Sequence, residues 1–301
     1  MNLVELADQH YRNFGERESL VFEERTYTNL QLLRFADQMS NGLINLGLEM
    51  GDRVMVMLNN CPEVLIGYQG ILRAGGVIVP LISLAGEREM FHILRNSEAK
   101  FLITNSNLVG KLEKVRPTME HLKKILLVGG EDIPDTLRMW EVIQQSPVAP
   151  LHLDIDEYDL AVILYTAGTT GEPKGVMLTH RNLCSNVVNA SSLADNQPGD
   201  VILHMLPLSH SYGLTVMNAC YMFDQKNVLM RWFNAEEAFR LIEKYKITGF
   251  SGSPAMFALM LNHPAADTYD LSSLRRCGSG SAPLPLEVMR GFQEKFNCPI
   301  R

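Results

Sequence analysis

Short apolar runs alternate with helix-length amphipathic segments along most of this chain, and this alternation constrains the fold more than any other feature. Apolar runs of this length, bounded by turn residues, predict buried strands. The expected strands lie at 53–58, 77–79, 101–104, 125–128, 160–165, 201–205, 227–230 and 248–251. Strands separated by helices need crossover connections, which produce a mostly parallel sheet covered by helices on both faces. The expected fold class is therefore α/β.

Residues that start helices support this pattern. Thr28, followed three residues later by Gln31, forms a capping box ahead of an amphipathic stretch, and Asn234 stands in the same relation to Glu237. Pro62 suits the first position of a helix, because that position has no intrahelical use for a backbone N–H. These signals place helices between the expected strands.

Charge and cysteine content exclude several classes of protein. The 301 residues contain 27 Lys plus Arg and 34 Asp plus Glu, a net charge of −7, so no basic field is available to hold nucleic acid. The five cysteines include no CxxC pair, which argues against a disulfide framework and against a zinc site. No apolar run is long enough to span a bilayer, and Glu5 and Asp8 interrupt any signal-peptide core. We expect a cytoplasmic protein that handles small molecules; peripheral membrane contact and a homodimer stay open.

The segment 164–180 carries the chemistry. It combines three glycines, three threonines and one lysine directly after an expected strand, and these are Gly168, Gly171, Gly175, Thr166, Thr169, Thr170 and Lys174. Glycine lets backbone N–H groups approach an anion closely, and hydroxyl groups and the lysine add donors and positive charge. A Gly/Thr-rich surface turn is the plain alternative. A Walker A loop is excluded by its spacing, because Pro173 stands where Gly is required and Gly175 follows the lysine. We expect a polyphosphate-binding loop.

Residues 165–176 resemble the phosphate-binding signature of the adenylate-forming superfamily, which includes acyl-CoA synthetases, luciferase-type enzymes and peptide-synthetase adenylation domains. Ala167 stands where many members have Ser. Four further stretches are similar to family motifs in the right order, namely 72–81, 206–213, 251–256 and 277–284. The segment 251–256 resembles the fatty-acyl type, so the resemblance is greatest to fatty-acid–CoA ligases.

The resemblance implies that ATP and a carboxylate form an acyl-adenylate and pyrophosphate, and that a thiol, usually coenzyme A, then takes the acyl group. A cradle of this kind with Mg²⁺ would neutralise the phosphates during the transfer. Thr166, Lys174 and His210 are the catalytic candidates, and Thr166 is also the metal candidate. By resemblance, the nucleotide is bound by Thr166, Ala167, Gly168, Thr169, Thr170, Gly171, Lys174, Gly280, Ser281, Ala282 and Pro283.

The pair His210-Ser211 bears on which acid enters. Peptide-synthetase domains place Phe-Asp here, and the Asp pairs with the ammonium group of an amino acid. His210-Ser211 supplies no anion, so an amino acid would bury an unpaired ammonium, which is costly. We expect a plain organic acid, with His210 near its carboxylate; the alternative is a histidine that only begins a helix. The expected acid-binding residues are His210, Ser211, Gly213, Phe250, Gly252, Ala255 and Met256, with Met260 as a further lining candidate, and they favour a fatty or other hydrophobic acid.

The resemblance also implies a domain organisation. Two stacked, mostly parallel α/β subdomains are expected, one at about 48–185 with the phosphate loop at 164–176, the other at about 15–47 plus 186–301. The stretch 147–159 reads as a linker, and 297–301 as the start of a strand that the chain does not complete. The family's metal-binding glutamate, ribose-binding aspartate, hinge and C-terminal lid are not present, so we expect a truncated N-terminal domain that is nearly inactive alone. An adenylation domain that loads a carrier protein and a non-catalytic ATP-binding module are the alternatives.

Overall fold

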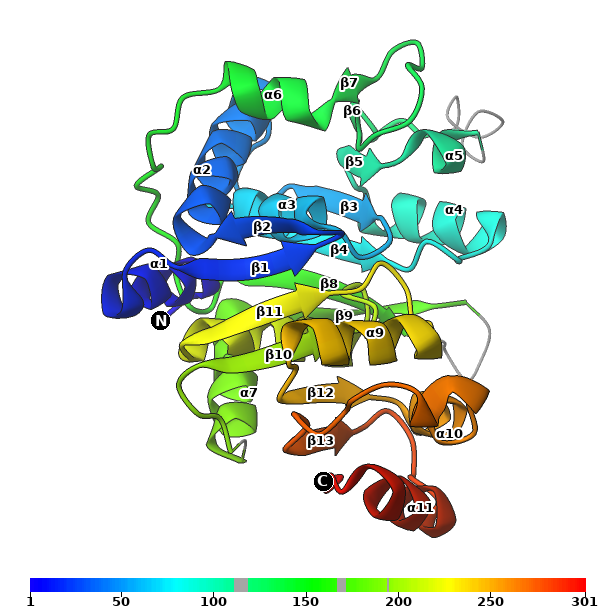
Figure 1. Cartoon of the computed structure of the whole chain (residues 1–301). Helices are drawn as coiled ribbons and strands as arrows, with labels where there is room; N and C mark the ends of the chain where they lie inside the picture. Colours follow the sequence, from blue (N-terminus) through cyan, green and yellow to red (C-terminus); the bar gives the residue numbers. More distant parts are fainter. Residues whose placement is uncertain (111–118, 167–171, 194) are drawn as a thin grey trace.

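The computed structural model describes residues 1–110, 119–166, 172–193 and 195–301, and within these the strands form two sheets (Figure 1). The seven-stranded sheet has the order β7-β6-β5-β3-β4-β8-β9, with β3 Arg53–Met57, β4 Val77–Leu81, β5 Phe101–Thr104, β6 Lys124–Leu127, β7 Leu137–Arg138, β8 Leu160–Thr166 and β9 Lys174–Thr179. The six-stranded sheet has the order β13-β12-β10-β11-β1-β2, with β1 Glu18–Phe22, β2 Arg25–Thr28, β10 Asp200–His204, β11 Gln225–Leu229, β12 Gly249–Gly252 and β13 Arg276–Ser279.

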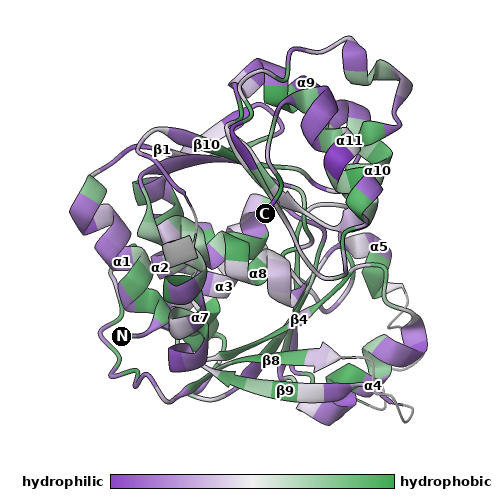
Figure 2. Ribbon diagram, turned by 90° about the horizontal axis from the view of Figure 1, so that it is seen from below, coloured by the Kyte–Doolittle hydropathy of each residue, from purple (hydrophilic) through white to green (hydrophobic). Residues whose placement is uncertain are grey.

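The helices lie outside and between the two sheets. They are α1 Leu3–Phe14, α2 Asn29–Asn45, α3 Pro62–Arg73, α4 Glu87–Ser97, α5 Ser106–Val109, α6 Met139–Gln145, α7 His180–Leu193, α8 Ser211–Ala219, α9 Ala235–Tyr245, α10 Pro254–Leu261 and α11 Leu286–Phe296. Figure 2 shows α9–α11 on one side of the molecule, α4 with β8 and β9 on the other, and α2, α3, α7 and α8 between them. The arrangement confirms the α/β class, with two mostly parallel sheets.

Each strand of a two-sided sheet divides its side chains between two layers. Along β3, Val54 and Val56 join the central core, while Met55 and Met57 join the outer core beneath α4. The same outer core contains Met90 and other apolar residues of α4. Successive strand residues point to opposite faces, so a strand that is apolar throughout is buried on both sides.

Every strand expected from the apolar runs is present within one or two residues of its expected bounds. The capping boxes are confirmed as well, since the Thr28 hydroxyl accepts from the Gln31 N–H and the Asn234 side chain accepts from the Glu237 N–H. The segment at 297–301 does extend a sheet, because Cys277 exchanges backbone hydrogen bonds of 2.9 Å with Pro299 and Arg301.

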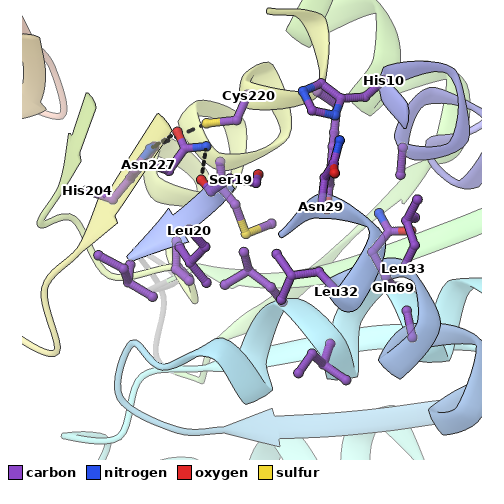
Figure 3. Close-up of a pocket in the computed structure, with 18 residues that line it drawn as sticks. His10, Ser19, Leu20, Asn29, Leu32, Leu33, Gln69, His204, Cys220 and Asn227 are labelled. Carbon is purple, nitrogen blue, oxygen red and sulfur yellow. Dashed lines mark hydrogen bonds between the residues drawn. The ribbon is translucent and has the colours of Figure 1, made fainter. Parts of the chain in front are cut away.

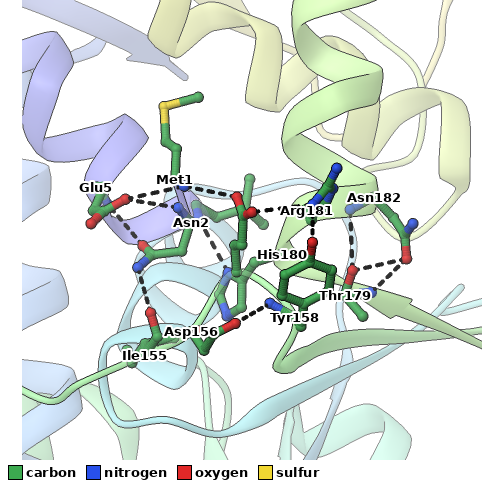
Figure 4. Close-up of polar contacts among 12 residues, drawn as sticks. Met1, Asn2, Glu5, Ile155, Asp156, Tyr158, Thr179, His180, Arg181 and Asn182 are labelled. Atoms are coloured by element: carbon green, nitrogen blue, oxygen red, sulfur yellow. Dashed lines mark hydrogen bonds and ion pairs between the residues drawn. The ribbon is translucent and has the colours of Figure 1, made fainter.

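Helix α1 is held to α7 through His180, a residue whose ring is almost fully buried (Figure 4). The Leu3 N–H donates to His180 Nδ1 at 3.2 Å, and the Asn2 side chain caps α1 while donating to the Ile155 carbonyl at 2.9 Å. The position of His180 directly after Thr179, a residue type that often begins a helix, predicts only a local role. Its partner instead lies 177 residues away along the chain.

The burial of His180 makes stability depend on pH. Burial lowers the pKa of His180 from 6.5 to about 4. The folded state therefore favours the neutral ring. The stability that the buried neutral ring contributes is complete above pH 6.5 and is lost as the pH falls from there towards 4. We expect the free energy of unfolding to drop by about 2 kcal/mol at about pH 5 through this group, measured by urea unfolding.

Two variants isolate the contribution of His180. Burial also lowers the pKa of His10 and of His204, so the quantity to compare is the difference between wild type and His180→Gln at each pH. His180→Gln should flatten the slope over this window, and His152→Gln, in an exposed stretch, should leave it unchanged. Equal slopes in wild type and His180→Gln would contradict the prediction.

Candidate functional site

The first part of the candidate site is the stem of the predicted phosphate loop. Strands β8 and β9 pair antiparallel, and their register sets Thr166 opposite Lys174 at the end of the pair that residues 167–173 connect. Both side chains are exposed. Ala167, Gly168, Thr169, Thr170 and Gly171 lie outside the described residues. The structure therefore brings together the two ends of the segment that the sequence singled out.

Close packing in this stem explains why residue 175 is a glycine. A Cβ at Gly175 would lie 2.8 Å from Ile163 Cγ2 and 3.1 Å from Tyr165 Cζ. Tyr165 and Gly175 are cross-strand partners, so the aromatic ring covers the glycine. A larger residue would push the two strands apart next to Lys174, which explains why this part of the motif needs glycine.

The second part is a cavity of about 420 Å³ that α8, β12 and β13 line. Tyr212, Thr215 and Val216 of α8 reach it, and so do Phe250 and Ser251 of β12 and Gly278 of β13. Most of the lining surface is apolar. Besides the hydroxyl groups of Tyr212, Thr215 and Ser251, its polar residues are Ser191, Asp195, Asn196, Gln225, Arg276 and Arg301. A cavity of this size and character can hold a small hydrophobic molecule.

The expected acid-binding residues divide into two groups. Phe250 lines the cavity and is 3% exposed. Gly213, Gly252, Ala255 and Met256 do not line it. A Cβ at Gly213 would lie 2.1 Å from the Pro207 carbonyl oxygen, so this glycine permits a close approach of α8 to the preceding loop. Met260, the further lining candidate, is fully buried in the core that α9, α10 and α11 form with the six-stranded sheet.

Sequence reasoning missed Tyr212, Thr215, Ser251 and Gly278. Tyr212 and Thr215 are three positions apart on α8, so they share one face, and this spacing was readable beside His210. Ser251 and Gly278 sit in register on adjacent parallel strands, near the strand ends where such sheets bind ligands. That neighbourhood depends on the pairing of β12 with β13, which no local pattern states.

His210 caps α8. Its Nδ1 accepts the Tyr212 N–H at 3.3 Å, and the ring is exposed. Since Nδ1 accepts, a neutral ring carries its proton on Nε2, which leaves that nitrogen as a donor. Ser211 is exposed in the first turn. His210 thus does begin a helix, and its other ring nitrogen stays available for a carboxylate.

The expected adenine segment follows β13 directly. The Gly280 N–H donates to the Gly252 carbonyl at 3.2 Å, and a Cβ at Gly280 would lie 2.7 Å from the Tyr212 ring. Ser281 adopts a φ of +72°, an uncommon conformation for a non-glycine residue. Ser281, Ala282 and Pro283 are exposed. Tyr212 therefore contacts both the cavity and the start of this segment.

An interior cavity of about 60 Å³ lies between the sheets but offers no reactive group (Figure 3). Cys220 Sγ lies 3.4 Å from His204 Nε2, which also contacts the Asn227 side chain at 3.0 Å. Burial raises the pKa of Cys220 to about 12 and lowers the pKa of His204. Both groups are therefore neutral, and a thiolate nucleophile does not form here.

A metal has few protein ligands in the described part of the chain. No group of three or more His, Cys, Asp or Glu side chains gathers there in a way that could hold one. The Thr166 hydroxyl is an oxygen donor of the kind that Mg²⁺ accepts, and Mg²⁺ commonly takes its remaining ligands from substrate phosphates and water. Thr166 thus fits a Mg²⁺ ion that arrives with a nucleotide. Among the described helices, none has the length and apolar character to cross a membrane.

Known proteins match this chain over nearly its whole length. The family described as AMP-binding enzyme matches residues 7–301. The chain is 34% identical to a long-chain-fatty-acid–CoA ligase of Bacillus subtilis (strain 168), over 93% of this chain and 55% of that relative. It spans about half the length of this curated relative.

Two solved structures share the fold. The N-terminal domain of FACL13 from Mycobacterium tuberculosis superposes with a TM-score of 0.88 at 22% identity, covering 100% of this chain and 74% of that one. ATP-bound MatB from Rhodopseudomonas palustris superposes with a TM-score of 0.87 at 25% identity, covering 100% of this chain and 59% of that one. The architecture of two mostly parallel sheets is thus the one found in these proteins.

Proposed function

Because the chain belongs to the AMP-binding enzyme family, we propose that it forms the nucleotide- and acid-binding part of an acid–thiol ligase that makes acyl-CoA by way of an acyl-adenylate. The observation that carries this proposal is the β8–β9 stem, which sets Thr166 and Lys174 opposite each other at the two ends of the Gly/Thr segment. The fatty-acid ligase among the relatives supports coenzyme A as the acceptor.

The proposed chemistry has two steps. A carboxylate oxygen attacks the α-phosphorus of ATP, and the bond to pyrophosphate breaks. The sulfur of coenzyme A then attacks the acyl carbon, and AMP leaves. In both steps the protein positions the reactants and balances charge; Lys174 supplies a cation for the phosphates, and His210 can donate from Nε2 to the carboxylate. Mg²⁺ bound with ATP would neutralise further phosphate charge.

The acid is proposed to be fatty or otherwise hydrophobic. Phe250, Val216 and the Tyr212 ring give the cavity apolar walls. His210-Ser211 supplies no anion for the ammonium group of an amino acid. We also propose two subdomains, one at about 48–185 and the other at about 15–47 plus 186–301. A cytoplasmic location and near-inactivity of the chain alone are proposed as well.

ATP titration by calorimetry in the presence of Mg²⁺ tests the nucleotide site. Wild type should bind ATP, and Lys174→Met should bind it about tenfold more weakly, because one charged contact to phosphate is lost. Lys226→Met is the control, since Lys226 pairs with Glu18 on the other sheet. Absence of ATP binding by the wild-type chain would overturn the proposed function, and equal affinity in Lys174→Met would remove Lys174 from it.

A further inference from the structure

Helix α4 contacts the stem of the phosphate loop through His92. The Nε2 atom of His92 lies 2.9 Å from the carbonyl oxygen of Pro173, and Nδ1 lies 3.0 Å from a carboxylate oxygen of Glu172. Figure 2 shows α4 beside β8 and β9. These two residues immediately precede Lys174, so the contact fixes the backbone that delivers the lysine to the expected phosphates.

Both contacts of His92 end on acceptors. A backbone carbonyl oxygen and an ionised carboxylate can only accept hydrogen bonds, while a neutral imidazole has one donor nitrogen and one acceptor nitrogen. A neutral His92 therefore satisfies one of the two groups, and only the imidazolium satisfies both. The side chain of His92 is 20% exposed and that of Glu172 is 67% exposed, so both contact solvent and the ring can exchange protons with it.

A second contact holds the other strand of the stem. The Tyr165 hydroxyl of β8 donates to Asn96 Oδ1 at 2.5 Å, and Asn96 lies one helical turn beyond His92. The Tyr165 ring meets the His92 ring edge-on, with 6.4 Å between centroids. Helix α4 itself is fixed by Met90 and Ile93 in the outer core. Helix α4, anchored in the outer core, thus contacts β8 and the two residues that directly precede β9.

We infer that His92 is a positioning residue which, as an imidazolium, locks the backbone next to Lys174 and makes nucleotide binding tighter as the pH falls. This inference rests on the proposed function, because it assigns a consequence to the position of Lys174. The proton comes from solvent, and no covalent bond changes. Among the described residues, the charged or titratable side chains that line the same pocket as His92 include Arg88, Arg95 and Glu98 of α4 and Glu120 and His121 of the neighbouring loop, and Tyr165 of β8 meets the ring edge-on.

Affinity measurements on the whole chain test the inference. ATP is titrated by calorimetry into wild type and into His92→Gln from about pH 8 to about pH 5.5, the range over which imidazole titrates. Glutamine keeps one donor for the Pro173 carbonyl but cannot acquire a charge. The terminal phosphate of ATP titrates in the same range, so the readout is the ratio of the two affinities at each pH.

The expected ratio is near one at about pH 8, where each side chain offers one donor, and rises to about fivefold in favour of wild type at about pH 5.5. His92→Ala, with no donor, should bind ATP about fivefold more weakly than wild type even at about pH 8. His121→Gln is the matched control and should follow wild type at every pH. A ratio that stays constant with pH, or that changes in His121→Gln instead, would overturn the inference.

A second measurement does not depend on ATP. The ¹⁵N chemical shifts of the His92 ring report whether each nitrogen carries a proton. In wild type we expect both ring nitrogens to carry protons where the ring bridges the Glu172 carboxylate and the Pro173 carbonyl oxygen, and Glu172→Gln should favour the neutral ring because the carboxylate no longer stabilises the charge. A wild-type ring that stays neutral over the pH range in which the ATP affinities are compared would overturn the inference. If instead the wild-type chain fails to bind ATP while both ring nitrogens of His92 carry protons, the proposed function fails, and only the bridge of His92 between Glu172 and the Pro173 carbonyl oxygen stands.

Discussion

Replacing Gly213 with alanine is expected to lower the free energy of unfolding by about 3 kcal/mol, the upper end of what overpacking a core costs. The added Cβ would lie 2.1 Å from the Pro207 carbonyl oxygen and 2.8 Å from its carbonyl carbon. Both atoms belong to the backbone, so no side-chain rotation relieves the clash. Either α8 or the loop before His210 must move. Thermal or urea unfolding measures the loss, which corresponds to a fall of about 5 °C in Tm for a chain of this size.

Gly67 is the matched control for Gly213. It also lies inside a helix and is buried, but its added Cβ would meet only Ile103 at 3.5 Å and Met139 at 3.8 Å, which are ordinary contacts. Gly67→Ala should therefore leave stability unchanged or raise it by up to about 1 kcal/mol through helix propensity. Equal effects of the two substitutions would show that the approach of α8 to Pro207 is not tight.

Replacing Gly278 with valine is expected to weaken the binding of a fatty acid such as dodecanoate about 30-fold. A Cβ at Gly278 would lie 3.1 Å from Ser251 Oγ and 3.4 Å from the Tyr212 hydroxyl, so the new side chain enters the 420 Å³ cavity between α8 and β12. It takes the place of two or three methylene groups of the acid. Each is worth about 0.8 kcal/mol, and about 2 kcal/mol in total corresponds to 30-fold.

A graded series separates a blocked cavity from a damaged fold. Gly278→Ala displaces about one methylene group and should cost about fourfold in affinity. The unfolding temperature should change little in either variant, because the added atoms enter the cavity rather than a packed core. Dodecanoate binding that is as tight in Gly278→Val as in wild type would place the acid elsewhere.

The parallel strands were predictable because their apolar runs are buried on both faces, as in β3 and β4. The hairpin of β1 and β2 was not predictable from the sequence. Its two turn residues, Glu23 and Glu24, have φ values of +45° and +71°, which tight hairpins require and which usually call for Asn or Gly. Glutamates carry no such signal. Here they are fixed by tertiary ion pairs, Glu23 with Arg231 and Glu24 with Lys244.

Strand β9 was missed for a different reason. The stretch from Lys174 to Thr179 directly continues the Gly/Thr segment, and four of its six residues are exposed at the edge of the sheet. No burial pattern marks it as a strand. Helix α1 did carry a signal, since Asn2 and Glu5 form a capping box. This capping box was not used as a helix signal, because Glu5 was interpreted only as a charge that interrupts a signal-peptide core.

The candidate site shows where local patterns stop being informative. The phosphate-loop residues are consecutive, so one segment revealed them. The cavity is assembled from α8, β12 and β13, and its lining follows from which strands become neighbours. Gly213 lies within a family-like motif, and the tertiary structure shows that it permits a close approach to the Pro207 carbonyl oxygen. A motif identifies the segment. Only the tertiary structure shows whether each side chain packs against neighbouring elements or faces the cavity.

The position of β1 affects how the protein is made. This strand lies between β2 and β11, and ion pairs such as Glu18 with Lys226 join residues 208 positions apart. At ordinary rates of translation a ribosome needs roughly 10–40 s to add that many residues. During this interval the apolar side chains of Leu20 and Phe22 on the nascent chain have no strand beside them on the β11 side. The six-stranded sheet is thus completed only after β11 has been synthesised, and until then the β1–β2 hairpin exposes an unpaired strand edge that chaperones can protect.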